Sequence, residues 1–167
     1  MIVVVWGVSG SGKTTVATQL GELMSWEVLD ADDFHPTSNV EKMRAGIPLT
    51  DADRKPWLDI LAEQLNARLQ RKQSAVVACS ALKQRYRTHL NVDPAQMAFV
   101  HLQGNFELIA QRLAKREHQY MNNSLLQSQF DALEPAPEGY AVGIEQPVAD
   151  ICAQICSKLG LAVWASD

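Results

Sequence analysis

The segment Gly7-Val-Ser-Gly-Ser-Gly-Lys-Thr14 decides how this chain folds. It has the pattern G-x-x-x-x-G-K-[ST], in which glycines let the backbone curl so that successive N–H groups point at phosphate oxygens. An apolar, β-branched run precedes it at residues 1–6, and a helical pattern follows it at residues 14–24. This strand–loop–helix context, which an accidental glycine-rich turn would lack, predicts a nucleoside triphosphate site.

The residues of this loop have distinct expected roles. Lys13 places a positive charge near the β- and γ-phosphates, and the Thr14 hydroxyl is the expected Mg²⁺ ligand. The positive end of the helix that begins here adds to the attraction for anions. The expected nucleotide-binding residues of the loop are Gly7, Val8, Ser9, Gly10, Ser11, Gly12, Lys13, Thr14 and Thr15.

Composition narrows the class of protein. The chain has 167 residues, of which 47% are hydrophobic and 20% charged, as expected for one soluble globular domain with a full core. Its net charge of −4 argues against nucleic acid as the main partner, since binding that backbone usually needs a basic face. No apolar run approaches the ~20 residues of a membrane span and no signal-peptide pattern opens the chain, so we expect a cytoplasmic protein with no membrane partner. The three cysteines are expected to be reduced and buried, a metal site being the less favoured alternative.

Apolar runs and helical periodicities alternate along the chain. This alternation predicts an α/β fold with a five-stranded parallel sheet, flanked by helices and joined by right-handed connections. Between the second and third strands lie two helical segments, a short one in 36–49 and a longer one that Thr50 can cap. The predicted strands occupy residues 1–6, 26–30, 73–79, 96–103 and 140–145.

Carboxylates follow the second predicted strand, at the edge where ligands of open α/β sheets bind. Asp30 and Asp32 are two residues apart, so in an extended strand their side chains point to the same side. One carboxylate can hold Mg²⁺ or its water shell while the other accepts a proton from a substrate hydroxyl, and Asp32 is the favoured base. The alternative is an acidic turn in which Asp32 or Asp33 caps a helix.

Three cationic side chains are candidates for binding an anionic substrate. Arg54 lies near the start of the longer helical segment, where it could reach the cleft or could pair with Asp51 or Asp53 at the surface. Lys83 and Arg87 follow the third strand and are four residues apart, so on a helix they would share one face. We favour a clamp for an anionic substrate over a solvated, charged helix, because loops at strand ends carry function in this architecture.

A basic helix end precedes a polar loop late in the chain. Arg112, Lys115 and Arg116 come before residues 118–123, and a second helical pattern follows at 125–133. This arrangement is typical of a mobile lid over ATP, whose arginines neutralise charge as the phosphoryl group transfers. Cations at a helix C-terminus also interact favourably with the negative end of the helix dipole. Arg112 and Arg116 can therefore serve the lid and stabilise the helix end at the same time.

Beyond the phosphate loop, several segments give the chain a family resemblance. It resembles the bacterial gluconate kinases (gluconokinases) of the small P-loop type in nearly the whole chain and in the same order. The most specific segments are Asp30-Ala-Asp-Asp-Phe-His-Pro36 and Gly46-Ile-Pro-Leu-Thr-Asp-Ala-Asp-Arg54. The others are Pro56-Trp57-Leu58, Cys79-Ser-Ala-Leu-Lys83 with Tyr86-Arg87, and Ser128-Gln-Phe-Asp-Ala-Leu-Glu134.

The resemblance implies ATP-dependent phosphorylation of D-gluconate at its 6-hydroxyl, giving 6-phosphogluconate and ADP. It implies a single P-loop kinase domain over residues 1–167 with a fold like shikimate and adenylate kinases. That domain would carry a substrate-binding insertion near 34–72 and a lid near 115–134, and it would form a homodimer.

The resemblance also assigns roles to residues, beside the nucleotide loop. The expected catalytic residues are Lys13, Asp32 and Arg116, with Arg112 on the nucleotide and Thr14 and Asp30 on Mg²⁺. The expected residues for gluconate are Asp32, His35, Arg54, Lys83 and Arg87, which offer cations for its carboxylate and hydrogen-bonding groups for its hydroxyls.

The chain departs from the family pattern in the lid. Where the family has Gly-His-Phe-Met-Pro, this chain has Glu117-His-Gln-Tyr-Met-Asn122, so the resemblance does not extend to lid dynamics, turnover rate or the choice of sugar acid. Rival functions are a kinase for shikimate or another aldonate, a nucleoside monophosphate kinase and a non-catalytic nucleotide-binding regulator. Cys79-Ser80-Ala81 does not match the glycine-rich stretch of shikimate kinases, and the chain has no Asn-Lys-x-Asp segment for guanine.

Overall fold

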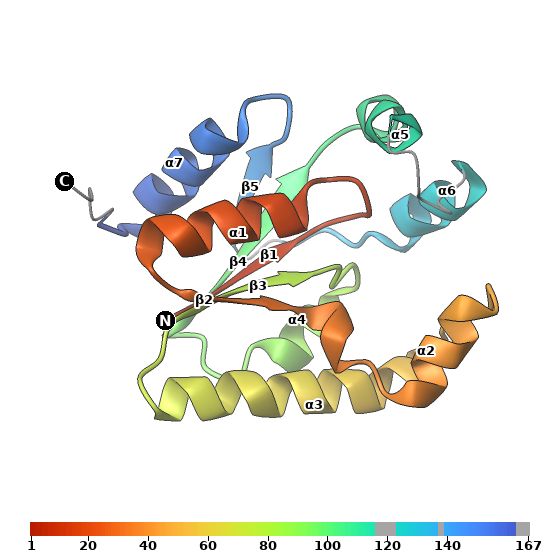
Figure 1. The fold of residues 1–167 in the computed structure, drawn as a ribbon, viewed down its shortest axis with the longest axis horizontal. Helices are drawn as coiled ribbons and strands as arrows, with labels where there is room; N and C mark the ends of the chain where they lie inside the picture. Colours follow the sequence, from red (N-terminus) through yellow and green to blue (C-terminus); the bar gives the residue numbers. More distant parts are fainter. Residues whose placement is uncertain (116–122, 137–138, 163–167) are drawn as a thin grey trace.

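A computed structural model describes residues 1–115, 123–136 and 139–162 of the chain. Its centre is one sheet of five strands in the order β2-β3-β1-β4-β5, and all pairs of neighbours are parallel (Figure 1). The five-stranded parallel sheet predicted from the sequence is confirmed. The strands are β1 (Ile2–Trp6), β2 (Glu27–Asp30), β3 (Ala75–Cys79), β4 (Met97–Gln103) and β5 (Tyr140–Gly143).

Strand β1 forms the middle of the sheet. Val4 is in register with Val77 of β3 on one side and with Phe99 of β4 on the other. Every residue of β1 and β3 is buried, as expected for central strands that helices cover on both faces. Their β-branched side chains suit such a pleated, enclosed surface.

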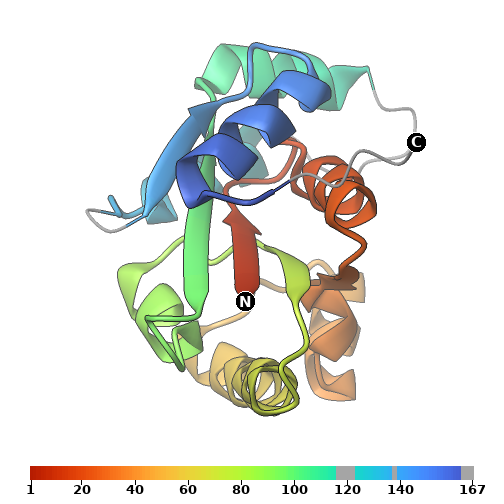
Figure 2. The same ribbon diagram turned by 90° about the vertical axis from the view of Figure 1, so that its left-hand side faces the viewer.

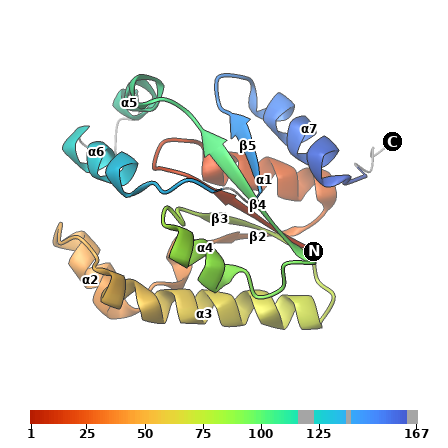
Figure 3. The same ribbon diagram turned by 180° about the vertical axis from the view of Figure 1, so that it is seen from behind.

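Two layers of helices cover the sheet, which lies between them in the edge-on view of Figure 2. One layer holds α1 (Lys13–Met24), α5 (Phe106–Ala114) and α7 (Val148–Leu159), and the other holds α3 (Asp51–Gln70) and α4 (Gln84–Leu90). Alternate residues of β1 point into the two cores, with Val3 and Val5 in the first and Val4 in the second. Figure 3 shows α4 beside α3 in the second layer.

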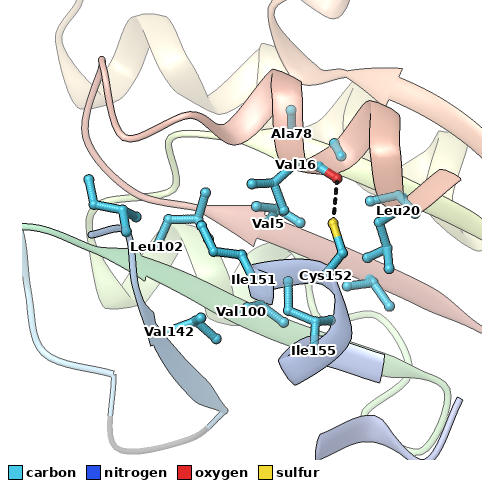
Figure 4. Close-up of a cluster of buried hydrophobic side chains, with 14 of the residues drawn as sticks. Val5, Val16, Leu20, Ala78, Val100, Leu102, Val142, Ile151, Cys152 and Ile155 are labelled. Carbon is cyan, nitrogen blue, oxygen red and sulfur yellow. Dashed lines mark hydrogen bonds between the residues drawn. The ribbon is translucent and has the colours of Figure 1, made fainter. Parts of the chain in front are cut away.

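The core between α1, α7 and the sheet contains a buried cysteine. Cys152 packs among Val16, Leu20 and Ile155, and its thiol donates to the backbone carbonyl of Val16 over 3.8 Å (Figure 4). All three cysteines of the chain are free and buried, as predicted. Burial raises the pKa of the Cys152 thiol to about 11, so at neutral pH it behaves as a small apolar side chain.

The segment after β2 forms a helical insertion. It contains η1 (Ala31–Phe34), a 3₁₀ turn, followed by α2 (Thr37–Arg44) and α3. Thr50 and Asp53 form a reciprocal capping box at the start of α3, which fixes where that helix begins. In Figure 1, α2 lies on the same side of the molecule as the carboxyl ends of the strands.

The lid region is described only in part. Helix α6 (Asn123–Ala132) lies on the same side of the molecule as α2, across the carboxyl end of the sheet (Figure 1). Arg116 and the altered segment 117–122 lie outside the described residues. The division into an insertion at 34–72 and a lid at 115–134 therefore stays a prediction. Within the described ranges, no helix is long and apolar enough to span a bilayer.

Candidate active site

A cavity of about 560 Å³ opens at the carboxyl ends of the strands. Its walls come from the phosphate loop, the ends of β2 and β3, the insertion and helix α6. A second cavity of about 420 Å³ shares Leu49, Arg54, Leu82 and Ala132 with the first and adds Lys83 and Tyr86. Because the insertion directly follows β2, the fold brings together side chains from four stretches of the chain that are distant from one another in the sequence. The first cavity is lined by Lys13, Thr14, Asp30, Asp32, His35 and Arg54, among others.

The phosphate loop has the backbone geometry that the motif requires. Gly10 and Gly12 have φ angles of 81° and 97°, which side-chain-bearing residues rarely adopt. A Cβ atom at Gly10 would also lie 2.8 Å from Leu113, so the loop packs closely on α5. Gly12 is the N-cap of α1 and provides no side-chain cap, which leaves the first N–H groups of the helix to bind a ligand.

Two expected metal ligands are adjacent. The Thr14 hydroxyl donates to the Asp30 carboxylate over 3.4 Å, joining the start of α1 to the end of β2. Mg²⁺ in kinase sites takes one or two oxygen ligands from the protein and the rest from phosphates and water, so this pair suits the ion. Asp30 also accepts the backbone N–H of Asp32 over 3.0 Å and caps η1, so it is Asp30, and not Asp32 or Asp33, that caps the turn.

The Asp32 carboxylate faces the cavity. Its side chain has 77% of its surface exposed and opens toward the phosphate loop. The protein walls still desolvate the group, and together with the nearby Asp30 carboxylate they raise the pKa of Asp32 above its ordinary value. A carboxylate in this position can accept a proton from a hydroxyl that lies beside the phosphate loop.

His35 is held at the floor of the same cavity. Its side chain is 4% exposed and stacks on Trp57 with 4.3 Å between the ring centroids. The Trp57 indole in turn donates to the carbonyl of Ala31 over 2.7 Å, which ties α3 to η1. Burial and the nearby positive charge of Arg54 lower the pKa of His35 to about 4, so the imidazole is neutral at physiological pH.

Arg54 lines both cavities and points toward Tyr86, with 5.8 Å from its guanidinium carbon to the ring centroid. The alternative surface pairs are taken by other cations, because Asp51 binds Lys83 at 3.0 Å and Asp53 binds Lys42 at 2.7 Å. Among the described residues Arg54 has no ion pair. It therefore presents an available cation to the cleft.

The expectation that Lys83 and Arg87 share a helix face is wrong. Lys83 has extended backbone angles of −92° and 142° and is the N-cap of α4, which begins one residue later. Its ammonium group binds the Asp51 carboxylate, which Arg85 and the Tyr86 hydroxyl also contact. These hydrogen bonds hold the pKa of Asp51 well below its usual range. Lys83 lines the second cavity, where it lies near Arg54.

Arg87 lines neither of the two cavities, which corrects its expected role on the substrate. It is 4% exposed, and one guanidinium nitrogen donates to the carbonyls of Ala81 and Leu82 at 2.9 Å each. The other donates to the carbonyls of Glu134 and Pro135, at 3.1 and 2.9 Å. Arg87 therefore joins the loop after β3 to the segment after α6.

The remaining arginines of the predicted site lie apart from the cavity or outside the described residues. Arg112 of α5 donates to the carbonyl of Ile144, just after β5. Its expected contact with the nucleotide stays a prediction, and so does the catalytic role of Arg116, which is not among the described residues.

Two residues of the site had no assigned role from the sequence. Gln129 of α6 accepts the backbone N–H of Ser9 over 2.7 Å and donates to the Ser9 hydroxyl over 3.1 Å, so it joins α6 to the phosphate loop. Asn39 of α2 is 2% exposed and contacts His35. Gln129 lies in a segment that contributed to the family resemblance, whereas no local pattern marks Asn39.

Comparison with known proteins agrees with this geometry. The chain matches the family described as AAA domain over residues 2–136. It is similar to a probable gluconokinase of Xenopus tropicalis, at 42% identity over 93% of this chain and 91% of the relative.

Solved structures show the same likeness. A sugar kinase from Janibacter sp. HTCC2649 superimposes with a TM-score of 0.88 at 43% identity, covering 96% of this chain and 95% of that one. A gluconokinase from Sinorhizobium meliloti 1021 gives a TM-score of 0.82 at 39% identity, covering 95% and 94%. Shikimate kinase from Aquifex aeolicus gives a TM-score of 0.61 at 17% identity over 96% of each chain, which shows a shared fold alone.

Proposed function

The chain belongs to the gluconokinase family of P-loop kinases, and from this premise we propose that it transfers the γ-phosphoryl group of ATP to the 6-hydroxyl of D-gluconate. The products are 6-phospho-D-gluconate and ADP. The observation that carries the proposal is that one cavity holds Lys13, the Thr14–Asp30 pair and the Asp32 carboxylate. A phosphate-binding loop, a magnesium position and a proton acceptor are the parts that phosphoryl transfer to an alcohol needs.

On the nucleotide side, the backbone N–H groups of the phosphate loop and the Lys13 ammonium bind the phosphates of ATP. Lys13 donates to the carbonyl of Val8 over 3.0 Å, which keeps the ammonium group folded over the loop. Thr14 and Asp30 hold Mg²⁺, which neutralises charge on the phosphates when bound. Arg112 binds the nucleotide, and Arg116, in the predicted lid, stabilises the transferring group.

On the substrate side, Arg54 and Lys83 bind the carboxylate of gluconate. Arg54 carries no ion pair among the described residues, so it is the stronger candidate, while Lys83 must share its charge with Asp51. His35 and Asp32 bind hydroxyls, and Asp32 accepts the proton of the hydroxyl that attacks the γ-phosphorus. Alignment of the two substrates and neutralisation of charge supply most of the rate enhancement.

A panel of acceptors tests the proposal. ADP release is measured with Mg–ATP and D-gluconate, L-idonate, shikimate, AMP or no acceptor, with Lys13→Ala as the inactive control. We expect strong stimulation by D-gluconate and a phosphate on its O6, which ³¹P NMR of the product identifies. If only another acceptor stimulated ADP release, the chain would still be a kinase, but its substrate would be that acceptor and not D-gluconate. Slow hydrolysis indifferent to every acceptor would favour a nucleotide-binding regulator.

A cytoplasmic location and a homodimer stay predictions.

A further inference from the structure

Asn39 makes a buried polar contact that the proposed function has not used. It lies in α2, in the insertion, and its side-chain nitrogen donates to the backbone carbonyl of Asp53 in α3 over 2.8 Å. A backbone carbonyl can only accept a hydrogen bond, so the atom of Asn39 on this side must be the NH₂ group. The contact thereby settles which way the amide of Asn39 is turned, a choice that often has to be assigned from the hydrogen-bond network.

The same NH₂ group determines the tautomer of His35. It lies 3.2 Å from His35 Nδ1 and has only hydrogens to offer, so Nδ1 must accept. A neutral imidazole that accepts at Nδ1 carries its hydrogen on Nε2. The ring is neutral because burial against Trp57 and the positive charge of Arg54 in α3 both disfavour its protonated form. Asp32 faces the ring from η1.

The Nε2–H group of His35 faces the Asp32 carboxylate. The two atoms are 3.9 Å apart, which is too long for a direct hydrogen bond. An oxygen that lies about 2.8 Å from each atom can bridge them. Such an oxygen must accept from His35 and donate to Asp32, and a hydroxyl can do both. A carboxylate cannot donate, and the negative charge of Asp32 repels it.

We propose that Asn39 is a positioning residue that fixes His35 as the Nε2–H tautomer, so that His35 and Asp32 together select a hydroxyl of the substrate. This inference deepens the proposed function and rests on it for the identity of the substrate. It makes His35 a hydrogen-bond donor and excludes it as the base, because Nδ1 is already engaged and Nε2 carries a hydrogen. Asp32 is left as the group that accepts from the hydroxyl.

The first test reads the tautomer in the unsubstituted protein, and a variant serves only to assign the signals. Two-bond ¹H–¹⁵N correlation spectra of the ¹⁵N-histidine-labelled protein distinguish protonated from unprotonated ring nitrogens, and His35→Gln identifies the signals of His35. At pH 7 we expect a hydrogen on Nε2 and none on Nδ1. A hydrogen on Nδ1, or on both nitrogens, would overturn the proposal. The spectrum does not depend on which acceptor the enzyme phosphorylates, so it fails or succeeds separately from the proposed function.

The second test reverses the donor. In Asn39→Asp the new carboxylate can only accept, so we expect the hydrogen of His35 to move to Nδ1 and kcat/KM for D-gluconate to fall about tenfold, the loss of one hydrogen bond to substrate. The KM for ATP should stay the same. Lys42→Met is the matched control, since it removes another link between α2 and Asp53, the 2.7 Å ion pair, without contacting His35. An unchanged tautomer in Asn39→Asp, or the same change of tautomer in Lys42→Met, would refute the role of Asn39.

Discussion

The guanidinium carbon of Arg87 lies 4.1 Å from the centroid of the Trp6 ring, at the end of the central strand. Trp6 also stacks on His101 of β4, with 4.1 Å between the two ring centroids. Arg87 thus combines a cation–π contact with hydrogen bonds to the backbone of the loop after β3 and of the segment after α6. A buried positive charge whose two terminal nitrogens donate to backbone carbonyls in this way belongs to the framework of the site.

Replacing Arg87 with Met should therefore lower stability and leave substrate affinity nearly unchanged. The methionine fills part of the space but leaves the carbonyls of two loops without a donor, so we expect the free energy of unfolding to fall by about 2–4 kcal/mol. Urea denaturation measures this change. Arg85→Met is the matched control on the same helix, because Arg85 is 57% exposed and a solvent-exposed ion pair contributes little to stability. Normal stability with a raised KM for D-gluconate would return Arg87 to the substrate site.

Features set by neighbouring residues could be predicted from the sequence. The five strands follow from short apolar runs, and the phosphate loop follows from its glycines and lysine. The loop motif predicts Thr14 as a ligand of Mg²⁺, and the place of Asp30 at the carboxyl end of the second strand makes it a candidate for the same ion. Their 3.4 Å contact agrees with that placement.

Features set by distant residues could not be predicted. Arg87 binds carbonyls of residues 47 and 48 positions away, and no local pattern reveals such partners. In α2 the apolar Met43 is 43% exposed on the cavity wall, whereas the polar Asn39 is buried. Asn39 takes that place because a carbonyl of α3 and the ring of His35 both need a donor there.

His101 makes stability depend on pH. Burial, together with the positive charge of Arg87, lowers its pKa to about 4, whereas in the unfolded chain the ordinary value is about 6.5. Between these two pH values His101 is protonated in the unfolded chain but not in the folded chain. Stability therefore falls as the pH drops from about 6.5 to 4. His35, with a pKa of about 4, acts in the same direction. Thermal unfolding at pH 7, 6 and 5 should show a falling Tm, with a smaller fall in His101→Phe. An equal fall in that variant would assign the pH dependence to other groups.

Gln129 should govern ATP affinity, because its amide oxygen accepts the Ser9 N–H of the phosphate loop at 2.7 Å. In Gln129→Glu a carboxylate takes that position beside the phosphates, so like-charge repulsion should raise the KM for ATP about tenfold or more and leave the KM for D-gluconate nearly constant. Steady-state kinetics with either substrate varied separates the two constants. Gln127→Glu makes the same change of charge at an exposed position of α6. A similar rise in both variants would mean that net charge alone, and not the contact with Ser9, sets the affinity.

Asp30 and Asp32 should separate into a metal ligand and a proton acceptor when each is replaced with Asn. Asn at position 30 keeps an oxygen that can accept the Asp32 N–H, so η1 keeps its cap while the charge next to Thr14 is lost. The Mg²⁺ concentration for half-maximal rate should therefore rise about tenfold. Asn at position 32 cannot accept the proton, so kcat should fall about 10²–10⁴-fold with little change in the Mg²⁺ requirement. ADP release titrated with Mg²⁺ measures both quantities. If Asp32→Asn instead raised the Mg²⁺ requirement and Asp30→Asn did not, the two roles would be exchanged, because both carboxylates line the cavity and the assignment of Asp30 to the metal rests on its 3.4 Å contact with Thr14.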